Sequence, residues 1–183
     1  MLRLKIFVLF VWGVLFLSGC FWWPSTKTIN FDIFSMQINE DFQEISGWVF
    51  EWEQIRHKIV KSFRHKDYER PFQDNIIISS TSLKDSVDTK TFAKWSVQNL
   101  KRKLSILNML WNIKKSSFNC TWQTIKWYYS KFEAYESIFD EEVKHYIMQY
   151  YFVYDKAGYI VSFASKEDNL SEFQNNIETM SCN

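Results

Sequence analysis

Hydrophobic residues along most of the chain follow patterns that are typical of β-strands. The segment 75–81 is rich in β-branched residues, which favour strands. Further strands are predicted at 31–38, 54–63, 111–121, 123–137, 143–154 and 159–165. The charged segments 64–70 and 138–142 predict turns between them. A further turn is predicted at 155–158, where Gly158 can take a positive φ.

Two helices are predicted from apolar residues at spacings of three and four. Asp88 can cap the first, because its carboxylate can accept bonds from free backbone N–H groups. Its apolar stripe is Ala93, Val97, Leu100, Leu104 and Leu107, and its opposite face carries Lys94, Lys101, Arg102 and Lys103. The second helix spans residues 166–180, with the stripe Leu170, Phe173, Ile177 and Met180. The order strands, helix, strands, helix predicts an α+β fold with a central antiparallel sheet flanked by helices.

The first 20 residues have a different pattern. Arg3 and Lys5 precede an apolar run from Ile6 to Phe16, and small residues follow. This order is typical of a secretory signal, because the run has about 11 residues and a stable membrane span needs roughly 20.

The sequence Leu17-Ser18-Gly19-Cys20 lies directly after the apolar run and resembles the bacterial lipobox. The resemblance implies that Cys20 receives a lipid and that the chain is cut before it. Residues 1–19 would then be a lipoprotein signal peptide, 20–29 a lipidated tether and 30–183 a single domain. Two acyl chains would hold the protein at a cell membrane, facing its extracytoplasmic side. The alternative is an ordinary signal or an uncleaved anchor with a chance cysteine.

Composition narrows the class of partner. Without residues 1–19, which include Arg3 and Lys5, the 22 basic residues become 20, against 21 acidic ones. This balance lacks the basic excess of a nucleic-acid-binding protein. Aromatic residues make up 19% of the chain, and only four glycines and two prolines occur. Such a composition suits long strands and argues against disorder.

Two cysteines remain beyond Cys20. Cys120 and Cys182 can form a disulfide in an exported protein. Closing the loop of about 60 residues between them would stabilise the fold by roughly 4 kcal/mol. Two separate buried thiols are the alternative. No short cysteine spacing indicates zinc.

The segment Gln149–Ser165 and the following helix with Phe173 and Ile177 resemble the PsbP-like family. The similarity extends over residues 30–181, and includes the strand 75–81. It implies an α/β/α sandwich around an antiparallel sheet. It implies no activity: plant members are accessory subunits of photosystem II, and bacterial relatives are lipoproteins or secreted proteins without a known reaction. No family motif of functional residues is present to carry over.

Few residues are candidates for chemistry. We expect His57, His65 and His145 to be structural, and the acidic run Asp140, Glu141 and Glu142 to be solvated rather than to bind a metal. The chain has no Gly-flanked serine elbow, HExxH pair or phosphate loop. We therefore predict no catalytic residue, metal or cofactor.

Aromatic residues occur on both faces of the strands 123–137 and 143–154. Packing in a sheet that is covered on both sides would explain them. The alternative is an aromatic binding surface that includes Trp127, Tyr129 and Tyr151.

These observations favour a lipid-anchored, non-enzymatic accessory that binds a protein not identified by the sequence. One alternative is a carrier of an apolar ligand in an aromatic-lined cavity, near residues such as Trp127 and Phe152. Another is an unrecognised hydrolase that uses His57 or His145.

Overall fold

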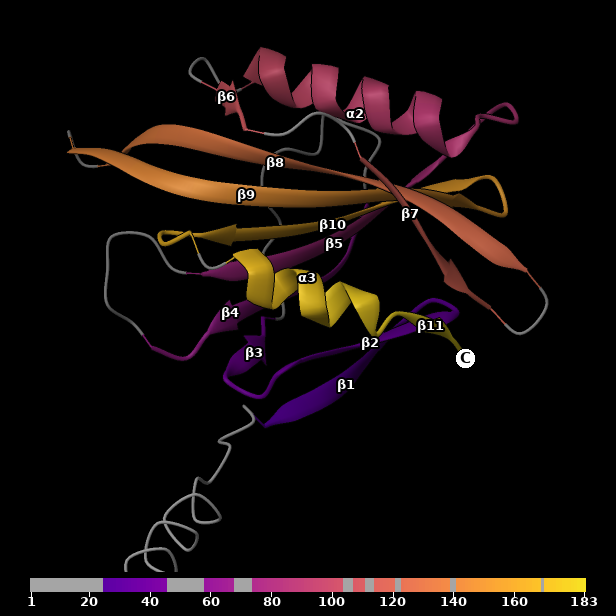
Figure 1. Ribbon diagram of the computed structural model, residues 1–183, viewed down its shortest axis with the longest axis horizontal. Helices are drawn as coiled ribbons and strands as arrows, with labels where there is room; N and C mark the ends of the chain where they lie inside the picture. Colours follow the sequence, from indigo (N-terminus) through magenta and orange to yellow (C-terminus); the bar gives the residue numbers. More distant parts are fainter. Residues whose placement is uncertain are drawn as a thin grey trace, which may run out of the picture.

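The computed structural model describes residues 25–45, 58–67, 74–103, 107–110, 114–120, 123–138, 141–168 and 170–183. They form two antiparallel sheets and two helices (Figure 1). Within these ranges, none of the helices combines the length and the hydropathy that a bilayer span needs.

The large sheet has eight strands. In spatial order they are β3 (Phe42–Glu44), β4 (Lys58–His65), β5 (Asn75–Ser82), β10 (Ala157–Ser165), β9 (Glu141–Tyr154), β8 (Thr124–Ile138) and β6 (Leu107–Met109), and β7 (Lys114–Asn119) also pairs with β8. The small sheet consists of β1 (Thr26–Phe31), β2 (Phe34–Asn39) and β11 (Ser181–Cys182). The helices are α2 (Thr89–Lys103) and α3 (Leu170–Glu178).

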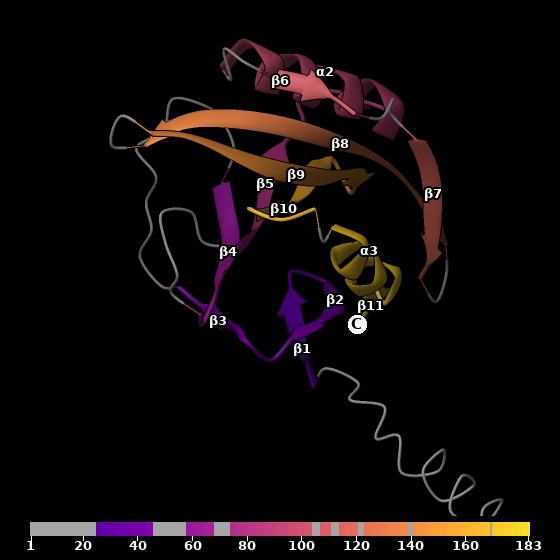
Figure 2. The same cartoon turned by 60° about the vertical axis from the view of Figure 1, so that its left-hand side comes forward.

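The elements form three layers. Helix α2 covers one face of the large sheet, and α3 with the small sheet covers the other (Figures 1 and 2). We call the face toward α2 the upper face and the face toward α3 the lower face. This arrangement confirms the expected α+β class and the sandwich around an antiparallel sheet.

The lower face holds the larger core, which consists mainly of aromatic and isoleucine side chains. Its members include Phe34, Met36, Ile38, Phe63, Ile76, Ile78, Phe118, Trp127, Tyr150, Phe152, Tyr159, Phe163, Phe173 and Ile177. The upper core is smaller and contains Phe92, Ala93, Val97, Phe132, Ala134, Ile147, Tyr151 and Ala164. Because successive side chains of a strand point to opposite faces, β8 and β9 need apolar residues at both odd and even positions.

Asp88 caps α2 as predicted. Its Oδ1 accepts hydrogen bonds from the backbone N–H groups of Lys90 (2.9 Å) and Thr91 (3.1 Å). Its Oδ2 accepts the Thr91 hydroxyl (2.7 Å). These bonds satisfy N–H groups that the first turn of a helix leaves without an intrahelical partner.

The turn between β9 and β10 differs from the prediction. Asp155 (φ 42°) and Lys156 (φ 60°) adopt the left-handed conformation there, rather than Gly158. Positive φ at both central residues is typical of the turns that match strand twist. Gly158 serves another purpose, because a Cβ at this position would lie 2.5 Å from Cε2 of Phe92. The glycine lets the first turn of α2 approach the sheet.

Several boundaries also differ. The strand predicted at 31–38 is the hairpin β1–β2, whose turn contains Asp32 at φ 52°. Residues 26–29, predicted as tether, belong to β1 because they pair with residues 36–39 of β2. Leu107, predicted in the first helix, begins β6 and pairs with Ala134. The first strand of the domain therefore begins before residue 30.

Helix α3 begins at Leu170 rather than near residue 166. The backbone N–H of Lys166 donates to Oδ1 of Asp74 (3.2 Å), and the Ser165 hydroxyl donates to Oδ2 of the same residue (2.9 Å). These bonds tie the segment before α3 to the start of β5, so it does not enter the helix.

Candidate functional site

Of the residues considered for lipidation or chemistry, Cys20, His57 and Asp140 lie outside the described residues, as does Leu104 of the predicted helix stripe. Glu141 and Glu142 begin β9, where they pair with Ile138 and Ser137 of β8. Among the residues that are described, no group of three or more His, Cys, Asp or Glu side chains could hold a metal ion.

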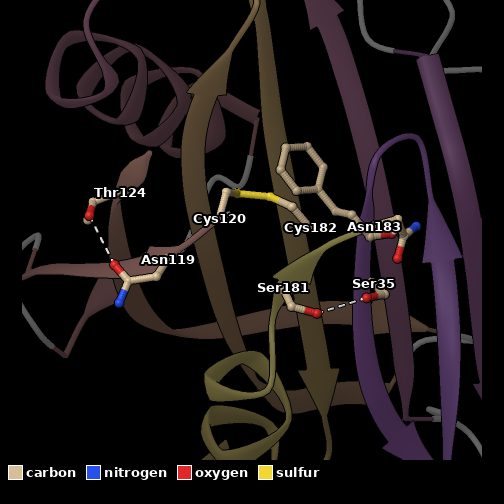
Figure 3. Close-up of a disulfide and its surroundings, with 8 residues drawn as sticks. Ser35, Asn119, Cys120, Thr124, Ser181, Cys182 and Asn183 are labelled. Atoms are coloured by element: carbon tan, nitrogen blue, oxygen red, sulfur yellow. Dashed lines mark hydrogen bonds between the residues drawn. A yellow bond between two sulfur atoms is a disulfide. The ribbon is translucent and has the colours of Figure 1, made fainter. Parts of the chain in front are cut away.

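Cys120 and Cys182 form a disulfide, with their Cα atoms 5.1 Å apart (Figure 3). Cys120 follows β7 of the large sheet, and Cys182 belongs to β11 of the small sheet. Beside it, the hydroxyls of Ser35 and Ser181 are hydrogen-bonded at 3.0 Å, which supports the pairing of β2 with β11 (Figure 3). The bond therefore joins the two sheets at one edge of the lower core.

The three aromatic residues of the predicted binding surface do not lie on one surface. Trp127 and Tyr129 point to the lower face, where both stack against Tyr150 with ring centroids 4.9 and 5.4 Å apart. Tyr151 belongs to the upper core and is 0% exposed. Trp127 is 3% exposed, so core packing explains these side chains. Burial also raises the pKa of Tyr150 and of Tyr151, and both phenols are therefore neutral at physiological pH.

The two described histidines are far apart in the sheet. His65 lies on β4, where its ring packs edge-on against Phe42 and its Nδ1 accepts the backbone N–H of Asp67 (3.3 Å). His145 lies on β9, points to the upper face and is 4% exposed. Strands β5 and β10 separate β4 from β9. The structure does not bring these histidines together.

One end of the β8–β9 hairpin projects beyond its neighbours (Figures 1 and 2). Strand β10 pairs with β9 only as far as Tyr146, opposite Ser165, whereas β9 itself begins at Glu141. We call residues 133–138 and 141–146 the arm. On its upper side, Ala134, Val143 and His145 are buried, and β6 pairs with β8 as far as Ala134.

The lower side of the arm carries charged and aromatic side chains. We call them the arm cluster, and they are Lys131, Glu133, Tyr135, Lys144, Tyr146 and, from the segment before α3, Asp168. Lys131 forms an ion pair with Asp168, and Lys144 forms one with Glu133. The Tyr135 hydroxyl also donates to Oε1 of Glu133 (3.1 Å).

Tyr146 lies between the two lysines of the cluster. The Nζ atoms of Lys131 and Lys144 lie 5.7 and 5.1 Å from the centre of its ring, within range of a cation–π interaction. The hydrogen bond with Glu133 raises the pKa of Lys144, and Lys144 lowers that of Glu133. Both groups are therefore charged at neutral pH, and the cluster is an ordered array of alternating charge around an aromatic ring.

The sequence analysis does not predict the arm cluster, although the residue pattern of the two strands indicates it. Lys131, Glu133 and Tyr135 occur at alternate positions of one strand, as do Lys144 and Tyr146 of the next. Alternate positions lie on one face of a strand. Polar residues at alternate positions near the end of a strongly aromatic strand therefore indicate that this face is no longer covered by the core.

No family model matches the chain, and no curated protein matches it in sequence. Solved structures do match. Cyanobacterial PsbP from Synechocystis sp. PCC 6803 has a TM-score of 0.60 at 8% identity, over 90% of this chain and 96% of that one. The Ran-binding protein Mog1p of Saccharomyces cerevisiae has a TM-score of 0.55 at 10% identity, over 86% of this chain and 95% of that one. The chain therefore has the PsbP-like fold that the segment Gln149–Ser165 indicated.

Proposed function

We propose that this protein is a lipoprotein, anchored through Cys20 on the extracytoplasmic side of a bacterial membrane. It acts there as a non-enzymatic accessory that binds another protein through the arm cluster. The lipobox-like sequence after the apolar run supports the anchor. The Cys120–Cys182 disulfide supports the compartment, because such bonds persist outside the cytoplasm.

The single observation that carries the binding role is the asymmetry of the arm. Ala134, Val143 and His145 are buried on its upper side, whereas its lower side carries ion-paired lysines and glutamate with two tyrosines. Tyrosine offers a large contact area with a hydrogen-bonding tip, and it is frequent at protein interfaces. Side chains already held by ion pairs lose less conformational freedom on binding. The arm cluster is therefore suited to a partner surface of alternating charge.

The fold similarity supports a binding role only in a general way. Mog1p is described by its name as Ran-binding, but one fold hosts many functions, so no partner is transferred to this chain. The choice of the arm cluster rests on its own geometry.

The carrier alternative gains no support from the residues that would line its cavity. Phe152 stacks on Tyr159 at 4.9 Å and meets Phe34 and Phe118 edge-on at 5.1 and 5.6 Å. Trp127 is similarly covered by Tyr150 and Phe118. Other rings occupy the space that an apolar ligand would need.

The anchor is tested by replacing Cys20→Ser in the full-length chain. We expect the variant to lose lipid labelling and to leave the membrane fraction, whereas Cys120→Ser should stay membrane-bound. Unchanged processing and fractionation of Cys20→Ser would refute the anchor.

The binding role is tested by charge exchange within the arm cluster. A tagged full-length chain is extracted from membranes with mild detergent, and co-purifying proteins are compared between variants. The Glu133→Lys/Lys144→Glu double variant can keep the ion pair but reverses its polarity, so we expect it to lose the partner while its melting temperature stays near that of the wild type. Lys58→Glu, at the exposed first residue of β4, is the control. Recovery of the same proteins with all three chains would contradict the proposal.

A further inference from the structure

The outer side of α2 carries cations around one large exposed aromatic residue. Trp95 is 50% exposed, which is exceptional in a chain whose other described aromatic side chains are at least partly buried. The remaining members of this surface are Lys90, Lys94, Lys101 and Arg102, all exposed. The helix contains no Asp or Glu. We call these five residues the α2 surface.

Helix geometry arranges the α2 surface into two rows. At 3.6 residues per turn, Lys90, Lys94 and Lys101 lie within about 40° of one another, along about 16 Å of the axis. Trp95 and Arg102 are seven residues apart and form a second row, about 100° around the helix. Gln98 lies between the rows. The core-facing side, with Phe92, Ala93 and Val97, packs against the sheet, and the five residues of the α2 surface are exposed among the described residues.

The neighbouring strands extend the same charge. Lys115 of β7 pairs with Tyr128 of β8, and Lys126 lies two residues before Tyr128. Tyr128 packs against the upper core, so by strand alternation both lysines lie on the α2 side of the sheet. Both are exposed. The Asp88 carboxylate lies at the first turn of α2, where it accepts backbone N–H groups of the helix. Six exposed cations therefore lie on α2 and the strands beside it, although the whole chain is almost neutral.

We propose that the α2 surface binds an acidic segment of a partner protein, with Trp95 buried at the centre of the contact. Tryptophan and arginine are the residues that most often dominate the energy of protein interfaces. Surrounding lysines attract an acidic partner and exclude basic ones. The surface lies on the opposite side of the sheet from the arm cluster, so the two sites can be occupied together.

Layer geometry favours a protein over the membrane that would hold Cys20, an argument that rests on the proposed anchor. Strand β1 lies on the opposite side of the large sheet from α2 (Figures 1 and 2). With layers about 10 Å apart and a helix radius of about 5 Å, the outer side of α2 lies about 25 Å from β1. The six residues from Cys20 to Thr26 span at most about 20 Å. If α2 lay flat on the bilayer, the segment from Cys20 to Thr26 would therefore be too short for the lipid on Cys20 to reach that bilayer.

The first test uses a defined probe. A fluorescein-labelled 20-residue amphipathic peptide rich in Glu is titrated with the full-length chain in nonionic detergent. We expect Lys94→Glu/Lys101→Glu to weaken binding at least about tenfold, and Trp95→Ala several-fold. The matched control Lys58→Glu/Lys166→Glu makes the same charge change elsewhere and should stay within about twofold. Equal affinities for all variants would overturn the proposal.

The second test identifies the native occupant. A photo-cross-linking amino acid replaces Gln98, which is exposed between the two rows, in the full-length chain, and the adducts are identified by mass spectrometry. We expect a protein peptide with net negative charge, whose yield falls with Lys94→Glu/Lys101→Glu and returns when the partner's acids become lysines. Phospholipid or nucleic-acid adducts, or failure of the charge exchange to restore the yield, would overturn it.

Repeating the cross-link with Cys20→Ser separates the two proposals. If fractionation is unaffected by this substitution, the anchor is refuted while a charge-dependent cross-link still supports the α2 surface. If the protein leaves the membrane but no protein adduct forms at position 98 in either chain, the α2 surface is refuted and the anchor stands.

Discussion

The two faces of the large sheet are closed by different means. The lower face packs aromatic rings from two sheets and α3, and the Cys120–Cys182 disulfide joins those sheets. The Tyr159 hydroxyl also donates to the Asp32 carboxylate of the β1–β2 turn, which ties that hairpin to the large sheet. The upper face is closed by one helix over small residues such as Ala134, Ala164 and Gly158.

This difference separates stability from recognition. The lower face buries more apolar surface, so it contributes more of the hydrophobic free energy of folding. The upper layer is a single helix whose outer side takes no part in the core, and that side holds the cations and Trp95. Changes deep in the lower face should therefore unfold the protein, whereas changes on the upper face should have smaller effects on unfolding.

The largest expected effect is that of Phe34→Ala. Phe34 is fully buried and meets Phe118, Phe152, Tyr154 and Tyr159 edge-on, with centroids 5.1–6.0 Å apart. We expect a loss of about 4–5 kcal/mol in the free energy of unfolding, measured by urea denaturation. Phe132→Ala, the same change on the upper face, should cost about 3 kcal/mol, because α2 can settle toward the sheet. The reverse order would contradict the comparison.

Removal of the disulfide should come next. Cys120→Ser/Cys182→Ser releases a link between residues 62 positions apart, and we expect a loss of about 4 kcal/mol. The measurement is urea denaturation with and without dithiothreitol. The reductant should destabilise the wild type and leave the double variant unchanged. Equal sensitivity of both proteins would show that the bond does not hold the lower face together.

Gly158→Ala tests the close approach of α2 to the upper face. The new Cβ would lie 2.5 Å from the Phe92 ring, and we expect overpacking to cost about 2 kcal/mol. Phe92→Leu removes the clashing ring atoms, so the double variant should lose less than the sum of the two single losses. Thermal denaturation of the wild type, the two single variants and the double variant gives the coupling energy between the two positions. Additive losses would show that the glycine has another role.

The sequence allowed the prediction of features that depend on local chemistry. The β-branched segment 75–81 forms β5, and the Asp88 carboxylate caps α2. The pairing of Cys120 with Cys182 is one of the two alternatives that the sequence leaves for these cysteines, and the structure shows it. Each follows from residue type and spacing, which tertiary contacts did not override.

Features that depend on distant partners were not predictable. The late start of α3 follows from Asp74, which lies more than 90 residues earlier in the chain. The positive φ of Asp32 turns one predicted strand into a hairpin, and nothing in the local pattern distinguishes this aspartate from others. The arm cluster required the register of β8 with β9, and the start of α3, before Lys131 could be placed beside Asp168.

The smallest effect is expected at the cap of α2, and it depends on pH. Hydrogen bonds from Thr91 lower the pKa of Asp88 below its ordinary value. A lowered pKa contributes stability that is present above the unfolded-state pKa, near 3.9, and is lost as the pH falls through the lower folded-state pKa.

Asp88→Asn keeps a side chain that can cap but does not titrate. Between pH 5 and pH 3 the melting temperature of the wild type should therefore fall slightly further than that of Asp88→Asn. Asp85→Asn, three residues away, should follow the wild type. Identical pH profiles for Asp88→Asn and the wild type would mean that the charge on Asp88 adds nothing to the cap, and that the upper face is held by α2 packing alone.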